Sequence, residues 1–237
     1  MSSPAPEFYH DVSPGPVDMG RFLSQPRPYH DGPVKAGHVN RNAALIADVA
    51  RLYIPYEARV LDMTFGSGAF WRDLESRRWF YLTANDLYSK DAEYDDDLAH
   101  THFRPETFDI VVLDPPYKSG GGHSPGPMVE QYGLNAIKSD TPSGHGNAKA
   151  VWRLYEDGFL EAYRILKPNG LLWVKCQDFV ESGRQHWFHI ELYRLALIMG
   201  FSVKDLFTLT TQVGRMRHLS QHHARKNVSY LWVLEKR

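Results

Sequence analysis

Cysteine is almost absent from this chain of 237 residues, because Cys176 is the one cysteine that it contains. A disulfide framework and a zinc site built on paired cysteines are therefore both excluded. No stretch approaches the ~18 consecutive apolar residues of a membrane-spanning helix, so an integral helical membrane protein is excluded as well. Residues 1–16 are rich in Pro and Ser and lack the basic start and apolar stretch of a secretory signal. These absences favour a cytoplasmic protein.

An excess of charge of one sign is also lacking. The net charge is −1, from 27 Lys and Arg against 28 Asp and Glu, so no global attraction to nucleic acid is expected. Charge is nevertheless clustered, since acidic residues crowd positions 91–97 and basic residues and histidines crowd positions 215–226. The basic cluster is either a solvated surface or a set of phosphate contacts, which would make binding depend on salt. Its histidines have no acids or cysteines at metal-ligand spacing, so no metal site is expected.

Apolar periodicity predicts alternating helices and strands after an irregular start. We expect helices over 38–53, 69–78, 151–166 and 185–199, and strands over 59–63, 79–84, 108–113, 171–174, 201–210 and 228–235. This alternation is typical of an α/β fold with a doubly wound, mostly parallel sheet. Residues 1–37 are Pro-rich and are predicted to form an extended N-terminal arm. Residues 38–237 form one domain, interrupted by a long Gly- and Pro-containing loop at 118–149.

A glycine-containing turn follows the first of the predicted inner strands. Asp62 ends that strand, Gly66 and Gly68 allow a tight turn and close approach of a ligand, and Asp86 ends the next strand. An acid in the position of Asp86 can accept hydrogen bonds from ribose hydroxyls. No third glycine follows at dinucleotide spacing, and an acid before the turn suits a cationic ligand such as S-adenosylmethionine. The alternative is a plain strand-to-helix turn.

A second cluster of polar residues ends the buried strand 108–113. Asp114, Pro115, Pro116 and Tyr117 follow it directly. The two prolines fix φ and remove two backbone donors, which makes the turn rigid and leaves its carbonyl groups free. The amino group of a nucleobase could donate one hydrogen to Asp114 and the other to the Pro115 carbonyl, while Tyr117 stacks on the ring. The alternative is a proline-rich strand exit with a buried tyrosine.

Together the segments 60–70 and 108–117 resemble the class I S-adenosylmethionine-dependent amino methyltransferases, in particular the DNA adenine-N6 and cytosine-N4 group. Segments 163–175 and 225–236 are similar to its helix, fifth strand and closing strand. The resemblance implies a Rossmann-like seven-stranded sheet, S-adenosylmethionine as cofactor, DNA as partner, and flipping of the target base, with adenine N6 favoured. It also implies roles for single residues. Asp62, Phe65, Gly66 and Gly68 would line the methionine part of the cofactor, and Asp86 would hold its ribose. Asp114, Pro115, Pro116 and Tyr117 would hold the target amino group.

Other readings stay open beside this resemblance. Ribosomal RNA amino methyltransferases carry a similar pair of motifs, and a catalytically silent, nucleic-acid-binding subunit is a third possibility. The length leaves no room for a separate target-recognition domain. Loop 118–149 and segment 215–226 are the candidate substitutes, through Lys118, Arg215, Arg217, Arg225 and Lys226.

Two remaining features of the sequence are expected to be structural. Cys176-Gln177 superficially resembles the nucleophile motif of cytosine-C5 methyltransferases, but it follows a different strand, so Cys176 is expected to be a small core residue. Trp152, Trp173 and Trp187 are also expected in the core.

Overall fold

The structure is a computed structural model and describes residues 32–74, 79–116, 148–181, 183–212 and 224–237. Its helices are α2 (Asn42–Tyr53), α4 (Ala148–Ile165) and α5 (Phe188–Ile198). Its strands are β1 (Gly37–Val39), β2 (Arg59–Asp62), β3 (Tyr81–Ala84), β4 (Phe108–Leu113), β5 (Leu166–Gln177), β6 (Phe179–Glu181), β7 (Arg184–His186), β8 (Phe201–Thr210) and β9 (Val228–Lys236). Most of the predicted arm 1–37 and of the predicted loop 118–149 lies outside the described residues.

Seven strands of the described chain form one sheet in the order β1-β8-β9-β5-β4-β2-β3. Strand β9 runs antiparallel to both of its neighbours, β5 and β8. Every other neighbouring pair of this sheet is parallel. The prediction of a doubly wound, mostly parallel seven-stranded sheet is therefore confirmed. Strands β6 and β7 form a separate two-stranded hairpin after β5.

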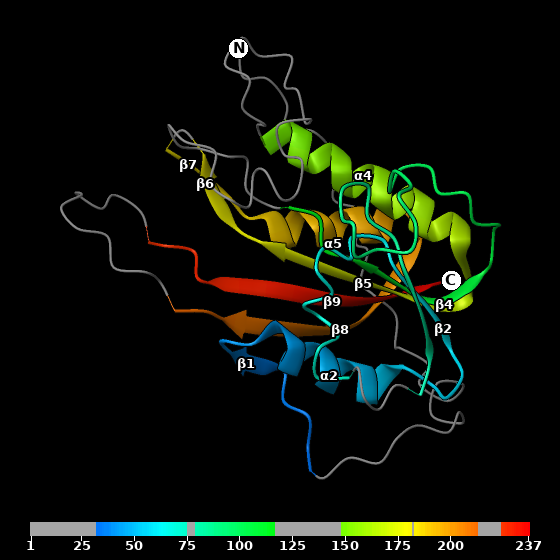
Figure 1. Cartoon of the computed structure of the whole chain (residues 1–237). Coiled ribbons are helices and arrows are strands. Elements are labelled where there is room, and N and C mark those ends of the chain that lie inside the picture. Colours follow the sequence, from blue (N-terminus) through cyan, green and yellow to red (C-terminus); the bar gives the residue numbers. More distant parts are fainter. Residues whose placement is uncertain (1–31, 75–78, 117–147, 182, 213–223) are drawn as a thin grey trace, which may run out of the picture.

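Helices cover both faces of the sheet, with α4 and α5 on one side and α2 on the other (Figure 1). Strand β4 shows why, because its side chains alternate between the two faces. Ile110 and Val112 pack in the cluster that includes α2, whereas Val111 and Leu113 pack in the cluster that includes α4 and α5. A strand that is apolar on both faces is the signature of the centre of a parallel sheet.

Two of the predicted helices differ from the structure in type or extent. Residues 69–74 form successive tight turns, not the start of a helix: the Trp71 amide donates to the Gly68 carbonyl at 3.0 Å, and the Leu74 amide donates to the Trp71 carbonyl at 2.8 Å. These three-residue steps bury Trp71 and Leu74 in the core. The helix predicted over 185–199 begins at Phe188, because Gln185 and His186 pair with β6 in the hairpin.

The N-terminal boundary of the domain also differs from the expectation. Residues 37–39 form an edge strand, and the first helix begins at Asn42, four residues later than predicted. Strand β1 pairs with β8, and the Thr208 amide extends the ladder by donating to the Ala36 carbonyl at 2.8 Å. The predicted arm therefore contributes its last residues to the sheet.

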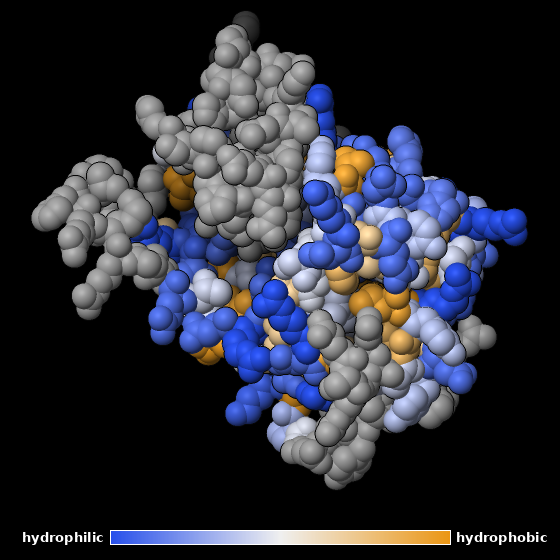
Figure 2. Space-filling view, in the orientation of Figure 1, coloured by the Kyte–Doolittle hydropathy of each residue, from blue (hydrophilic) through white to orange (hydrophobic). Residues whose placement is uncertain are grey.

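The three tryptophans that were expected in the core do not share one environment. Trp173 is fully buried and Trp152 packs against the α4–α5 cluster, as predicted. Trp187 is 52% exposed, so its assignment to the core was wrong. It precedes α5 directly after the hairpin and belongs to neither core cluster. The described surface in Figure 2 is mostly hydrophilic with scattered hydrophobic areas, and none of the described helices is long and apolar enough to cross a membrane.

Candidate functional site

The chain changes direction across the sheet between β2 and β4. From β2 it proceeds outward to β3 at one edge and then returns to β4 on the other side of β2. Ligands of open α/β sheets bind at such a point, beyond the carboxyl ends of the strands. Asp62 is the last residue of β2, and Asp114 is the first residue after β4. The two sequence-predicted turns therefore meet at the position where a ligand is expected.

Asp62 is almost fully buried and holds the turn that follows it. Its Oδ1 accepts a hydrogen bond from the Thr64 amide at 3.0 Å, and its Oδ2 accepts one from the Trp71 indole Nε1 at 2.8 Å. Burial is the main reason why the pKa of Asp62 is raised to about 7, and the negative charges of Asp114 and Asp86 add to it. The carboxylate is thus costly to ionise unless a positive charge approaches it.

The turn after β2 depends on two glycines with left-handed backbones. Gly66 has φ 56° and Gly68 has φ 68°, a region that other residues rarely adopt. A Cβ on Gly68 would also lie 2.7 Å from Cζ of the Phe65 ring, closer than carbon atoms can approach. Phe65 itself packs against the α2 side of the core. Phe65 and the two glycines therefore form one compact turn, as the sequence predicted.

Asp86 joins this turn to the one that follows β3. Its Oδ2 accepts a hydrogen bond from the Gly66 amide at 2.8 Å, and its Oδ1 accepts bonds from the Tyr88 and Ser89 amides, both at 2.9 Å. The Ser89 hydroxyl donates back to the Gly66 carbonyl. Two carboxylate oxygens offer about four acceptor positions, so one position on Oδ2 remains for a ligand hydroxyl.

Thr64 links the β2 turn to the β4 turn. Its hydroxyl accepts a hydrogen bond from the Asp114 amide at 2.8 Å and lies 3.5 Å from Oδ1 of Asp62. The orientation of the Asp114 backbone is thereby set by a residue of the other turn. No local sequence pattern predicts this link, since the two residues are far apart in the chain.

The Asp114 side chain is 18% exposed. Its Oδ2 is 3.5 Å from the Nζ of Lys175, which lies on the neighbouring strand β5. Burial raises the pKa of Asp114 to about 6, although the positive charge of Lys175 opposes that rise. The Oδ1 atom is buried and finds no hydrogen-bond partner within the described residues. It is therefore an acceptor in position for a donor that the described chain does not supply.

The prolines lie next to this acceptor, as predicted. Pro115 is buried and Pro116 is half-buried. The Tyr155 hydroxyl donates to the Lys175 carbonyl at 2.8 Å and lies 3.4 Å from the Pro115 carbonyl. Its better bond is to Lys175, so the Pro115 oxygen keeps acceptor capacity. Tyr117, the last residue of the predicted motif, lies outside the described residues.

Carboxylates dominate the electrostatics of this edge of the sheet. Asp62, Asp86 and Asp114 interact closely enough for the last two to raise the pKa of the first. Such a concentration of negative charge favours a cationic ligand over an anionic one. Across the described ranges, no group of three or more His, Cys, Asp or Glu side chains could hold a metal ion.

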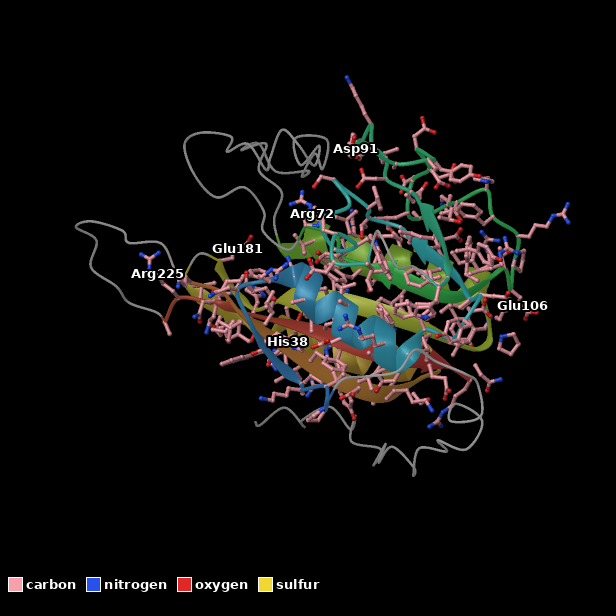
Figure 3. All side chains as sticks on the ribbon, turned by 60° about the horizontal axis from the view of Figure 1, so that its bottom comes forward. His38, Arg72, Asp91, Glu106, Glu181 and Arg225 are labelled. Atoms are coloured by element: carbon pink, nitrogen blue, oxygen red, sulfur yellow. The ribbon has the colours of Figure 1, made fainter. Side chains whose placement is uncertain are left out.

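An exposed aromatic residue and a cation lie together at the same edge of the sheet. The Lys226 Nζ lies 5.0 Å from the centre of the Trp187 ring, and Arg225 beside it is exposed. Arg225 lies near Glu181 of the hairpin that follows β5, whereas Glu106, which precedes β4, lies at the opposite end of the sheet (Figure 3). Lys118, Arg215 and Arg217, the other predicted nucleic-acid contacts, lie outside the described residues.

Cys176 is a core residue. It is fully buried beside Lys175 on β5, in the cluster that contains α4 and α5. Burial, with the nearby charge of Asp178, raises the pKa of its thiol well above the usual range. A thiol of this kind does not supply a thiolate nucleophile, which agrees with its prediction as structural.

Sequence reasoning missed three residues of this site. Thr64 gave no signal beyond its place in the turn. Asn85 is fully buried and forms two hydrogen bonds with the backbone of Asp96. Its Nδ2 donates to the Asp96 carbonyl and its Oδ1 accepts from the Asp96 amide, each at 3.0 Å. Lys175 could have been found, because it is one cation at the end of an apolar strand, the kind of residue that is rarely buried without a partner.

Comparison with known proteins identifies the fold. The chain matches no protein-family model, and no curated protein matches its sequence. Among solved structures, an S-adenosylmethionine-dependent methyltransferase from Methanosarcina mazei is 14% identical and superposes with a TM-score of 0.50, covering 79% of this chain and 96% of that chain. The cyclase SpnF is 11% identical with a TM-score of 0.51, covering 82% of this chain and 80% of that one. A proposed sarcosine dimethylglycine methyltransferase from Galdieria sulphuraria is 12% identical with a TM-score of 0.50, covering 82% and 84%.

These likenesses concern the fold alone. The chain has the Rossmann-like fold of class I methyltransferases. Two of the three neighbours are named for methyl transfer and one for a cyclisation, so the shared fold does not decide the reaction. The chemistry of this chain has to be argued from its own residues.

Proposed function

We propose that this protein transfers a methyl group from S-adenosylmethionine to the exocyclic amino group of a DNA base, with adenine N6 as the favoured target. The observation that carries the proposal is that the turn after β2 and the turn after β4 lie together, at the point where the chain reverses its direction across the sheet. One turn concentrates negative charge at Asp62 and Asp86. The other presents the Oδ1 of Asp114, which has no partner among the described residues, beside two prolines.

The residues of the first turn fit the cofactor. S-adenosylmethionine carries a cationic amino group and a sulfonium, which match the three carboxylates of this edge. Phe65, Gly66 and Gly68 bring the backbone close to the carboxyl end of β2 and would line the methionine part. Asp86 has one acceptor position left, which suits a ribose hydroxyl.

The second turn fits an amino group that must be made nucleophilic. The nitrogen of an aromatic amine is a poor nucleophile, because its lone pair is delocalised into the ring. Asp114 Oδ1 and the Pro115 carbonyl can each accept one of its two hydrogens, which favours the pyramidal geometry of attack. Preorganised acceptors of this kind are worth more in a site shielded from water than in solution.

The cofactor supplies an electrophilic methyl group on its sulfonium. The chain's own residues then have to orient the amino nitrogen and accept the proton that it loses once the new carbon–nitrogen bond has formed. Asp114 Oδ1 is placed for both tasks, and a carboxyl with a pKa of about 6 can hold that proton briefly and pass it to water. No covalent intermediate is needed, in keeping with the buried and inert Cys176.

Nucleic acid as the partner is supported by the exposed Trp187 and by Lys226, whose ammonium group lies over the Trp187 ring. Bases stack on exposed aromatic rings, and cations bind the phosphate backbone. This pair lies beside the carboxyl end of β5, since the Gln177 Nε2 that ends β5 donates to the Lys226 carbonyl at 3.0 Å. When a base enters the site, the adjacent nucleotides of its DNA strand could thus bind to Trp187 and Lys226.

Transfer of tritiated methyl groups tests the proposal. Unmethylated duplex DNA, single-stranded DNA and ribosomal RNA are each incubated with the protein and methyl-labelled S-adenosylmethionine, and the labelled nucleoside is then identified. We expect N6-methyladenine in DNA. Asp157→Ala, which changes an exposed acid on α4, is a matched control that should leave transfer unchanged.

Each other outcome has a definite meaning. Label in ribosomal RNA alone would make the protein an RNA amino methyltransferase. Cofactor binding with no transfer to any nucleic acid would contradict the proposed substrate class. Absence of cofactor binding, measured by calorimetry, would contradict the whole proposal.

A further inference from the structure

Lys175 is a charged residue in an unusual place. It is 2% exposed and lies near the end of β5, after a run of fully buried residues from Leu171 to Val174. A lysine that is removed from water loses its hydration, a cost that is normally offset by a charged partner. The carboxylate of Asp114 is that partner, at 3.5 Å. The Nζ of Lys175 also lies 5.5 Å from the centre of the Phe70 ring, a position in which an aromatic face attracts a cation.

The surroundings of Asp114 otherwise work against its ionisation. Burial disfavours the charged carboxylate, and Asp62, at the end of β2, is a second acid close enough for the two charges to repel. Cys176 on β5 is kept protonated by burial, and Tyr155 from α4 presents a neutral hydroxyl. Among the described groups that face Asp114, Lys175 is the one whose charge favours the carboxylate form.

The two oxygens of Asp114 are unequal as a result. Oδ2 points toward Lys175, and Oδ1 has no partner among the described residues. The Asp114 amide is fixed in turn by the Thr64 hydroxyl. Residue Asp114 is therefore held at its amide and at its Oδ2, which leaves Oδ1 as an acceptor.

We propose that Lys175 is a positioning residue, which keeps Asp114 ionised and turns its Oδ1 toward the amino group of the target base. This inference rests on the proposed function and adds to it the residue that keeps the Asp114 carboxyl ionised. A protonated Asp114 could present a hydrogen where the amino group needs an acceptor. Loss of Lys175 should thus lower the transfer rate at neutral pH, because more of Asp114 is protonated. It should leave the cofactor turn unchanged.

The chain offers a matched control on the same two strands. Lys167 of β5 pairs with Asp109 of β4 at 2.7 Å, at the amino ends of the strands and away from the site. Lys167→Met removes a lysine–aspartate pair between β5 and β4 just as Lys175→Met does. If both pairs are merely structural, both variants should be less stable than the parent. The pH dependence of the transfer rate should then change in neither variant.

Two measurements on Lys175→Met test the inference. The first is the pH dependence of the transfer rate at saturating substrates. Because an opposite charge at this distance lowers a carboxyl pKa by about 1–3 units, the acid limb of the profile should move to higher pH by about that amount. Transfer at pH 7 should fall about twofold if the pKa rises by about 1 unit and about tenfold if it rises by about 2 units, and it should recover as the pH rises above the new midpoint, whereas cofactor affinity stays within about threefold. Lys175→Arg, which keeps the charge, should keep the parent profile, and so should Lys167→Met.

The second measurement needs no activity. The ¹³C signal of the Asp114 carboxyl, assigned by its absence in Asp114→Asn, is titrated in the protein without ligands. Its midpoint should rise in Lys175→Met and in the shorter polar variant Lys175→Gln, which is used if the methionine variant does not fold. An unchanged midpoint and an unchanged acid limb would overturn the inference. If the parent protein methylates no nucleic acid, the proposed function fails by itself, while the titration still decides whether Lys175 controls the charge of Asp114.

Discussion

Thr64 accepts the main-chain hydrogen bond of Asp114 at 2.8 Å, so the turn after β2 and the turn after β4 are tied together by one side chain. The first turn is the candidate cofactor site and the second the candidate site of the target amino group. A displacement of one turn will therefore also displace the other. Methyl transfer in line between two ligands requires such fixed relative placement.

Replacement of Asp114 should remove methyl transfer and leave cofactor binding nearly intact. Asp114→Ala takes away one of two acceptors for the amino hydrogens, and a single oriented group of this kind is worth about 10²–10³ in turnover. Asp114→Asn keeps one acceptor oxygen, so part of the activity should remain. Turnover by the tritium assay and cofactor affinity by calorimetry check the two expectations. Transfer by Asp114→Ala near the parental rate would show that the target nitrogen is held elsewhere.

Gly68→Ala should weaken cofactor binding, whereas Gly183→Ala, which carries a similar backbone strain, should not. Both Gly68 and Gly183 have positive φ, at 68° and 76°, but a Cβ meets the Phe65 ring at Gly68 and open space at Gly183. Each alanine costs roughly 1–3 kcal/mol of strain. Only Gly68→Ala has to displace Phe65 from the turn.

Calorimetry with S-adenosylmethionine on both variants separates strain from site geometry. We expect a loss of about tenfold or more in affinity for Gly68→Ala, equivalent to about 1.4 kcal/mol, and little change for Gly183→Ala. Equal affinities in the two variants, with both folded, would speak against the cofactor site at this turn.

The stability of the ligand-free protein should fall as the pH rises from about 4 to about 7. Asp62 and Asp114 have pKa values of about 7 and about 6 in the folded protein, and both ionise near pH 4 when unfolded. The folded state therefore binds more protons than the unfolded state within this window. The free energy of unfolding then decreases with rising pH and levels off above pH 7.

Asp62→Asn isolates the contribution of one group to this slope. Thermal unfolding at a series of pH values should show a flatter dependence between pH 4.5 and 7.5 in the variant than in the parent, whatever the variant's overall loss of stability. A cationic ligand should stabilise the parent more at pH 7.5 than at pH 5.5, because it binds the ionised carboxylates. Parallel slopes in parent and variant would contradict the raised pKa of Asp62.

Trp187→Ala should weaken the binding of single-stranded DNA. Stacking of a base on an exposed aromatic ring contributes roughly 1–3 kcal/mol. Tyr56 offers a matched control, since it is 50% exposed against 52% for Trp187 but precedes β2, at the opposite end of the sheet. Fluorescence anisotropy should show a loss of affinity of fivefold or more, at about 1 kcal/mol, for Trp187→Ala and none for Tyr56→Ala. A loss of equal size in both variants would remove Trp187 from the proposed interface.

Most strands could be predicted from the sequence to within two residues at either end. Strands β4 and β8 have the predicted bounds. For β4 the reason is that a strand buried on both faces leaves a short apolar run with polar ends. Strand β5 extends beyond the predicted 171–174 at both ends. The helix expected after Gly68 was wrong because the apolar side chains of that stretch are buried by successive tight turns. The residues before Phe188 fit a helical period, but they pair as a hairpin instead, a competition that local pattern does not decide.

Of the candidate site, the sequence revealed the residues at the ends of strands and not the bonds between them. Asp62, Asp86 and Asp114 were predicted because parallel strands bring their carboxyl ends to one edge. The Thr64 hydroxyl bond and the Lys175 ion pair join segments that are distant in the chain, and no local pattern encodes such partners. Trp187 lies in a segment that the sequence predicts as a helix with a wide apolar face, but it precedes the first turn of the observed helix and is exposed.

The pairing of β1 with β8 constrains the order in which the sheet can assemble. Gly37 lies opposite Thr208, so the earliest of the described strands has its partner close to the end of the chain. During synthesis on the ribosome, β1 emerges before every other described strand and must wait until β8 has been made. Strand pairs that are far apart in the chain form slowly, and an unpaired edge strand can meanwhile pair with other chains and aggregate. Strand β1 is only three residues long, which limits the unpaired edge that a nascent chain exposes while it waits.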